Sequence, residues 1–123
     1  VVVLPENFAY FGDEAGKRNV AESLEGDGPI VTTLRDAARA RRLTILAGGM
    51  AERSSDPARP YNTCAAFGPD GRLLARYRKI HLFDVDIPGQ PPLRESGLFR
   101  AGDQLVTTFA NGTAHSRVEE THS

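Results

Sequence analysis

The 123-residue sequence has few of the features that mark specialised protein classes. It contains one cysteine, one methionine and no tryptophan, and 15 basic residues nearly balance 16 acidic ones, for a net charge of −1. A single cysteine cannot form an internal disulfide, which favours a reducing compartment. The charge balance provides no field that would recruit nucleic acid or an anionic membrane, and no apolar run approaches the roughly 18 residues that span a bilayer. We therefore expect a cytoplasmic protein with no nucleic-acid or membrane partner.

The remaining composition is ordinary. Hydrophobic residues make up 40% of the sequence, charged residues 25% and aromatic residues 7%, which is typical of a soluble globular protein and argues against collagen, coiled-coil rods and disorder. The length fits one domain. Because the sequence opens inside an apolar run, Val-Val-Val-Leu, we expect a segment upstream of it in the parent protein.

The first half of the sequence predicts a strand–helix–strand unit. Residues 1–4 and 43–49 are apolar runs typical of strands buried on both faces, the second ending in Gly48 and Gly49. A short helix is predicted over residues 17–24, and a longer one begins at Pro29 with an apolar face and an arginine-bearing face. This order favours an α/β fold with a parallel strand pair.

The second half predicts antiparallel strands. Residues 62–67 and 72–79 flank the turn sequence Gly-Pro-Asp-Gly. Strand alternation places Lys79 with Leu73, Ala75 and Tyr77 on one face, opposite a face of arginines. Residues 81–97 are predicted as a loop, residues 104–110 as a strand, and Asn111-Gly112 as a hairpin turn. Residues 114–123 show no period and are expected to form an unpatterned tail.

Three charged residues are candidates for a functional site. Glu6 follows a buried strand, where open α/β sheets place ligand sites, although a solvated strand end would look the same. Lys79 on an inward face could be a buried catalytic cation, or its stem could pack on Tyr77 while the ammonium reaches water. Glu95 lies in a proline-rich stretch that has no chemical signature of its own.

Other reactive residues point to packing rather than chemistry. Cys64 falls in the middle of a predicted strand, where cysteine usually behaves as a small hydrophobe. His81, Asp84 and Asp86 are close in sequence, but two of the three histidines lie in the predicted tail, so we expect no metal site. No glycine-rich phosphate loop joins a strand to a helix, and no cofactor is expected.

A set of short motifs, taken in order, resembles the nitrilase superfamily of carbon–nitrogen hydrolases. The motifs are Leu-Pro-Glu at residues 4–6, Gly-Gly at 48–49, Tyr-Asn-Thr at 61–63, Gly-Pro-Asp-Gly at 68–71 and Tyr-Arg-Lys-Ile-His-Leu at 77–82. The run over residues 77–88, followed by Glu95-Ser96, is most similar to the omega-amidase branch, with the deaminated-glutathione amidases close behind. The resemblance covers residues 1–113, which it identifies as a partial hydrolase domain.

The resemblance implies an αββα sandwich and a thioester mechanism that uses a cysteine, a glutamate and a lysine, often with a second glutamate. Glu6 would match the general base, Lys79 the cation that stabilises the oxyanion, and Glu95 the second glutamate. It also implies a small amide substrate that carries a second carboxylate, ammonia as a product, and a homo-oligomer at full length.

One family element has no counterpart in the sequence. The family nucleophile lies in a Gly-x-x-x-Cys-Tyr-Asp segment, which would begin near Thr113, whereas Cys64 belongs to the Tyr-Asn-Thr stretch. The expected identity is therefore a fragment of an amidase, cut at both ends. The alternatives are a non-catalytic scaffold or pseudogene product, and a fragment of a deaminated-glutathione amidase, nitrilase or carbamoylase.

Overall fold

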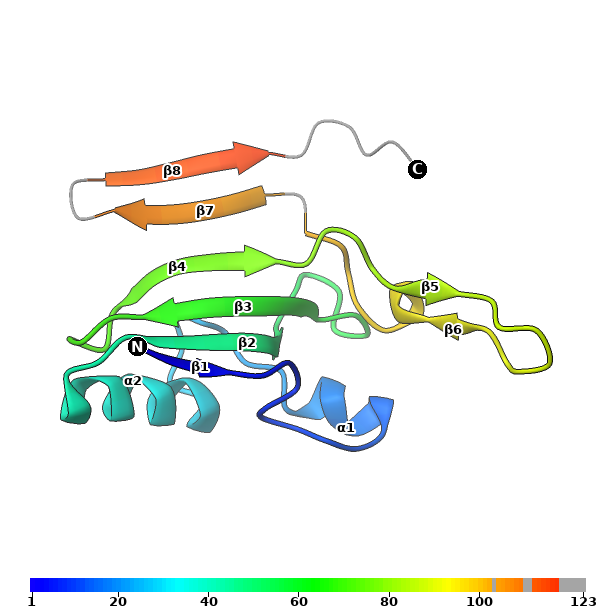
Figure 1. Cartoon of the computed structure of the whole chain (residues 1–123), viewed down its shortest axis with the longest axis horizontal. Helices are drawn as coiled ribbons and strands as arrows, with labels where there is room; N and C mark the ends of the chain where they lie inside the picture. The colour runs from blue at the N-terminus through cyan, green and yellow to red at the C-terminus, as the bar shows by residue number, and fades with distance from the viewer. Residues whose placement is uncertain (103, 110–111, 118–123) are drawn as a thin grey trace.

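A computed structural model describes residues 1–102, 104–109 and 112–117 of the chain. Its main element is a six-stranded sheet with the order β1-β2-β3-β4-β7-β8 (Figure 1). The sheet strands are β1 (Val2–Leu4), β2 (Ile45–Glu52), β3 (Tyr61–Phe67), β4 (Leu73–Arg78), β7 (Gln104–Phe109) and β8 (Gly112–Arg117). β1 pairs with β2 in parallel, and the other neighbours are antiparallel.

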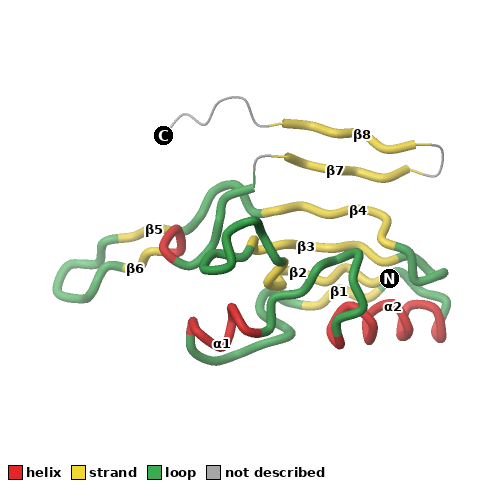
Figure 2. Tube along the Cα trace, turned by 180° about the vertical axis from the view of Figure 1, so that it is seen from behind, coloured by secondary structure: helices red, strands yellow, loops and turns green. Residues whose placement is uncertain are grey.

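The predicted strand–helix–strand unit is confirmed. Helix α2 (Pro29–Arg41) starts with proline at its first position and lies beside the β1–β2 end of the sheet (Figure 2). The apolar residues of α2 recur at spacings of three and four and therefore share one face of the helix. This face packs on the alternate residues of β2 and β3 that point toward it, and together they form one buried cluster. The cluster consists of Leu24, Val31, Leu34, Ala38, Ile45, Ala47, Met50, Ala65 and Phe67.

Helix α1 (Glu14–Asn19) begins and ends earlier than the predicted helix over residues 17–24. Asp13 caps its first turn, because the Asp13 side chain accepts a hydrogen bond from the Gly16 backbone N–H at 2.7 Å. Beyond α1 the chain is extended, since Glu22 forms a parallel bridge with Glu52 beside the sheet. Leu24 then enters the core with no exposed surface. Contact with the sheet therefore overrides helix propensity in this segment.

The buried side chain of Glu22 caps α2 from a distance. Gly28, the residue that precedes α2, supplies no side-chain cap. The Glu22 carboxylate instead accepts hydrogen bonds from the backbone N–H groups of Ile30 and Val31, each at 2.9 Å. These groups lack partners within the helix, and a negative charge at this end also favours the helix dipole.

Replacing Glu22 by alanine should therefore destabilise the chain by about 1–3 kcal/mol, because two backbone donors at the start of α2 lose their acceptor. Glu22→Gln keeps one acceptor oxygen and should lose less. The measurement is the free energy of unfolding from urea titrations. Equal stability of all three proteins would show that the contact does not stabilise α2.

Strand β2 continues through the glycines at which it was predicted to end. A bulge between Ala47 and Met50 shifts the pairing with β3, and Gly49 lies there at φ +58°. A Cβ atom on Gly48 would come within 2.8 Å of the Leu4 carbonyl oxygen, and one on Gly49 within 2.5 Å of the Glu6 side chain. The glycines are therefore needed for the close approach of the segment that carries Glu6.

The hairpin of β3 and β4 around residues 68–71 is confirmed, but Leu73 lies on the opposite face of the sheet from the one predicted. Its register shifts between Ala66 and Phe67, so that Leu73 pairs with Phe67. Leu73 consequently packs against the buried cluster. Simple alternation predicted that Leu73 shares a face with Tyr77, and this prediction is wrong. The extra residue of the bulge reverses the alternation on one side of it.

The segment over residues 81–97 is more ordered than the predicted loop. It contains a two-stranded hairpin, β5 (Asp84–Val85) with β6 (Leu93–Arg94), followed by a 3₁₀ turn, η1 (Glu95–Gly97). The hairpin projects beyond the end of the main sheet (Figure 1). Two-residue strands are too short for an alternation pattern to reveal them.

The C-terminal strands agree with the prediction in part. The strand predicted over residues 104–110 is observed as β7. Residues 114–117, predicted to begin an unpatterned tail, belong to β8, which pairs with β7 over six residues. Backbone hydrogen bonds form such a ladder without an apolar pattern in the sequence. The rest of the predicted tail and Asn111 of the predicted hairpin turn lie outside the described residues.

Candidate active site

The three charged residues singled out in the sequence come together at the ends of strands. Glu6 follows β1, Lys79 follows β4, and Glu95 begins η1. The Lys79 Nζ atom lies 2.8 Å from Oε2 and 3.1 Å from Oε1 of Glu95. Glu6 and Lys79 line the same two cavities. The prediction that Lys79 shares a face with Tyr77, away from the arginines, agrees with this lining.

Asn62 joins the two carboxylates. Its side-chain Nδ2 donates to Oε1 of Glu6 at 2.7 Å and lies 3.3 Å from Oε1 of Glu95. The residue is 5% exposed, and its backbone carbonyl accepts a hydrogen bond from the Lys79 N–H at 2.8 Å. Sequence reasoning used Asn62 only as part of a motif. The available signal was its place on β3 two residues before Cys64, which puts both side chains on one face.

The hairpin that precedes Glu95 fixes the position of its carboxylate. Asp84 on β5 accepts hydrogen bonds from the Ser96 backbone N–H at 2.9 Å and the Ser96 hydroxyl at 2.6 Å. The Phe83 backbone N–H donates to the Glu95 carboxylate itself. A segment without a predicted helix or strand thus presents Glu95 to Lys79, because β5, β6 and η1 form one hydrogen-bonded unit.

The Glu95–Lys79 ion pair is stabilised in its charged form. Burial acts on Glu95 to raise its pKa, but hydrogen bonds from Lys79, Phe83 and Asn62 outweigh it, so the Glu95 pKa lies below its ordinary value. The hydrogen bond to Glu95 raises the pKa of Lys79, and the negative charge of Glu6 adds to the effect. The carboxylate is therefore retained to lower pH, and the ammonium to higher pH, than in free side chains.

The first of the two cavities, which we call the Glu6 cleft, has a volume of about 350 Å³. It is lined by Glu6, Gly48, Gly49, Asn62, Cys64, Tyr77, Lys79 and His81. Cys64 is half-buried within it, and burial raises the pKa of its thiol. A raised pKa disfavours the thiolate, which is the nucleophilic form. The position and ionisation of Cys64 therefore do not make it an activated nucleophile.

The second cavity, which we call the Lys17 cavity, adjoins the same catalytic candidates and has a volume of about 380 Å³. It is lined by Glu6, Asn7, Lys17, Lys79, Phe83, Leu93, Glu95, Leu98 and Phe99. The Lys17 Nζ atom lies 5.2 Å from the centroid of the Phe99 ring, a cation–π distance. Sequence reasoning missed Lys17, because only the fold brings α1 beside η1.

The opposite face of β4 carries an ion-pair network. Glu52 is 2% exposed, and its carboxylate accepts hydrogen bonds from Arg78 at 2.6 and 2.9 Å and from the Thr63 hydroxyl at 2.7 Å. Arg76 lies 3.4 Å from Glu52 and 2.7 Å from Glu25. The predicted separation of the arginines from Lys79 is thus borne out by their contacts. This network anchors the strand whose end carries Lys79.

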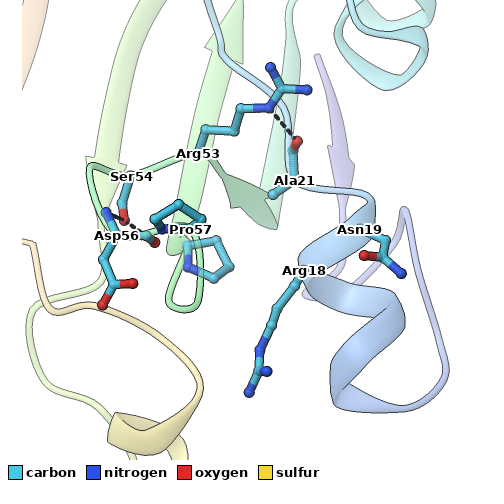
Figure 3. Close-up of a pocket in the computed structure, with 8 residues that line it drawn as sticks. Arg18, Asn19, Ala21, Arg53, Ser54, Asp56 and Pro57 are labelled. Carbon is cyan, nitrogen blue, oxygen red and sulfur yellow. Dashed lines mark hydrogen bonds between the residues drawn. The ribbon is translucent and has the colours of Figure 1, made fainter.

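A further cavity of about 210 Å³ lies between α1 and the loop after β2. Arg18 and Arg53 both line it, but Figure 3 shows their guanidinium groups pointing in opposite directions. Arg53 instead donates to the Ala21 carbonyl oxygen at 3.0 Å. The two arginines therefore do not converge on a common anion site.

Neither a metal centre nor a membrane span is found in the described part of the chain. Within residues 1–102 and the described parts of β7 and β8, no group of three or more His, Cys, Asp or Glu side chains is arranged to hold a metal ion. Among the same residues, no helix has the length and hydropathy of a membrane span.

The sequence and fold were compared with known proteins. Residues 1–118 match the family model described as carbon-nitrogen hydrolase. An omega-amidase of Pongo abelii is 39% identical over 113 residues, and a chloroplastic omega-amidase of Arabidopsis thaliana is 41% identical over 108 residues. These matches cover 87% and 84% of this chain, but only 38% and 28% of the relatives' own lengths.

The structural comparison agrees. The NitFhit protein of C. elegans matches with a TM-score of 0.71 and 33% identity, over 86% of this chain and 27% of that one. Nit3 of Saccharomyces cerevisiae, described as a member of the nitrilase superfamily, matches with a TM-score of 0.65 and 25% identity, over 91% of this chain and 39% of that one. The expected α/β fold is thereby confirmed, and the chain belongs to the carbon–nitrogen hydrolase family.

Proposed function

We propose that this chain supplies the base, the lysine and the second glutamate of an amidase that cleaves the C–N bond of a small amide and releases ammonia. The observation that carries the proposal is the convergence of Glu6, Lys79 and Glu95 on one pair of adjoining cavities. A carboxylate, an ammonium and a second carboxylate that holds the ammonium can serve as the base, the oxyanion stabiliser and the positioning group of acyl transfer to a thiol.

In the proposed reaction, a cysteine thiol outside this sequence attacks the amide carbon. The C–S bond forms in this attack as Glu6 accepts the thiol proton, which gives a tetrahedral intermediate. The C–N bond then breaks as Glu6 passes the proton to the nitrogen, which leaves as ammonia, and a thioester remains. Lys79 stabilises the oxyanion of the tetrahedral intermediate, and Glu95 holds Lys79 in place. Glu6 then takes a proton from water as the water attacks the thioester, and the thiol is regenerated with release of the acid. Such thiol chemistry suits the reducing cytoplasm proposed for the protein.

The proposed substrate is the monoamide of a dicarboxylic acid. Lys17 supports this choice, because it places a positive charge on the wall of the cavity that also contains Glu6 and Lys79. Within the described residues, Lys17 has a cation–π contact with Phe99 but no ion pair, whereas Lys79 is paired with Glu95. A substrate carboxylate would provide Lys17 with a partner. The aromatic and leucine side chains beside it would contact the substrate's carbon chain.

Replacing Lys17 by methionine should lower kcat/KM for succinamate about tenfold or more, because a charge-assisted hydrogen bond to the distal carboxylate is lost. Hydrolysis of a neutral amide of similar size should be unchanged. Arg18→Met is the matched control, since this neighbouring cation on α1 lines the separate cavity of Figure 3. An equal loss for both substrates would contradict a role of Lys17 in recognising the carboxylate.

The test of the proposed function starts from the gene. The DNA from the Leu105 codon onwards should be read in all three frames for a continuation that contains a Cys-Tyr-Asp segment. The protein that includes this continuation should release ammonia from succinamate, and the 123-residue chain alone should release none. Turnover by the 123-residue chain that is unaffected by Cys64→Ala would overturn the thioester mechanism. If no frame supplies a cysteine and no turnover is found, the chain acts as a non-catalytic scaffold.

The same assay distinguishes related substrates. Deaminated glutathione, a nitrile and a carbamoyl amine would be tested beside succinamate under identical conditions. A preference for one of these over succinamate by kcat/KM would replace the proposed substrate while leaving the roles of Glu6 and Lys79 unchanged.

A further inference from the structure

Asn62 is the buried residue that stands between the two carboxylates of the site. The cluster contains two carboxylates, Glu6 and Glu95, and among the residues that the structure describes Lys79 forms an ion pair with Glu95 and not with Glu6. Like charges close together disfavour each other's ionised form unless donors or cations compensate them. A primary amide has two N–H hydrogens, and the Asn62 nitrogen lies within hydrogen-bond distance of one oxygen of each carboxylate.

We propose that Asn62 is a positioning residue, which directs one amide hydrogen to each carboxylate and so holds Glu6 apart from the Glu95–Lys79 pair. Its catalytic consequence rests on the proposed function, in which a Glu6 whose oxygens are not paired with Lys79 is available to exchange protons with the nucleophile.

The backbone around Asn62 makes this role geometrically specific. Asn62 pairs with Ala51 on β2, and its carbonyl oxygen accepts the Lys79 N–H. The same residue thus fixes the backbone at Lys79 and the side chains of both glutamates. The residue is 5% exposed, so its side chain is held by the two carboxylates and the surrounding strands.

Other titratable and charged groups also face the cluster and belong in any account of its pH dependence. They are Lys79 after β4, Tyr77 on β4, His81 beyond it, Cys64 on β3 and Lys17 on α1. Asn62 differs from them because it does not titrate, so it donates to both carboxylates at every pH at which they are ionised.

The proposal can be tested on the 123-residue chain by NMR. In the unaltered chain, the side-chain amide signals of Asn62 should shift with pH in step with the carboxyl carbon signals of Glu6 and Glu95. The amide of Asn19, an exposed residue on α1, is the internal control and should not follow them. This measurement needs neither a nucleophile nor a variant that folds. An Asn62 amide that stays constant while both carboxyls titrate would overturn the proposal.

A variant gives the direction of the effect. Asn62→Ala should move the titration midpoint of Glu95 to higher pH, because one of the donors that lower the pKa of this carboxyl is lost. Asn62→Asp, which adds a third carboxylate, should move it further. Asn19→Ala controls for the substitution itself. An unchanged Glu95 midpoint in a folded Asn62→Ala chain would contradict the proposal.

Kinetics separates positioning from a purely structural role. In the protein that hydrolyses amides, Asn62→Ala should move the acid limb of the kcat/KM profile to higher pH, whereas a structural defect would lower the rate without moving it. NMR coupling without any amide hydrolysis would leave the role of Asn62 intact and refute the proposed function. Amide hydrolysis without the NMR coupling would support the proposed function and refute the role of Asn62.

Discussion

Replacing Glu6 by glutamine should lower the rate of amide hydrolysis by about 10²–10⁴-fold, the usual contribution of a general base. Glutamine keeps the size of the side chain and can still accept the hydrogen bond that Asn62 donates to Oε1, but it cannot take a proton from a thiol or from water. The measurement is kcat/KM for ammonia release from succinamate by the protein that includes the cysteine-bearing continuation.

Glu25→Gln is the matched control for this variant. The Glu25 side chain is 62% exposed and pairs with Arg76 in the network on the opposite face of β4. The control should therefore retain full activity. A Glu6→Gln protein as active as this control would show that another group is the base. Another residue of the cluster would then have to accept the thiol proton.

Replacing Glu52 by alanine should destabilise the chain by about 3–5 kcal/mol, the cost of removing one partner from a buried ion pair. The guanidinium of Arg78, 19% exposed in its side chain, would lose a carboxylate that it contacts through two nitrogens. The hydrogen bond to Glu52 is the main cause of the raised pKa of Arg78, which agrees with this coupling. Thr63, fully buried, would lose its acceptor as well.

The measurement is the free energy of unfolding in urea, with Asp36→Ala as the control. Asp36 forms an ion pair with Arg39 on α2, but both side chains are more than 60% exposed, and such pairs contribute about 0–1 kcal/mol. Glu52→Gln, which keeps the shape of the side chain, should fall between the two. A loss for Glu52→Ala no larger than that for the control would contradict the stabilising role of the buried network.

Elements with strong periodicity could be predicted from the sequence. The strand before Glu6, the helix from Pro29 and the hairpin around residues 68–71 are all observed. The prediction that the first strand is buried on both faces is wrong, because it lies at the edge of the sheet with Val2 and Val3 exposed. The signals of these elements are local, because a 3.6-residue or two-residue period requires only that each element bury one face or both. The same alternation placed Lys79 opposite the arginines. The order of the motifs also predicted the family, and the match to the family model confirms it.

Contacts between residues that are far apart in the sequence became visible in the fold alone. Glu95 has no local signature, and the hairpin of β5 and β6 with η1 brings it to Lys79. In the sequence, Asn62 is only one residue of a motif. In the structure, β3 places it between two carboxylates. Lys17 and Phe99 adjoin because α1 and η1 fold to one end of the sheet. Contacts of this kind depend on crossing chain segments whose register is set by bulges and caps, and no local period encodes them.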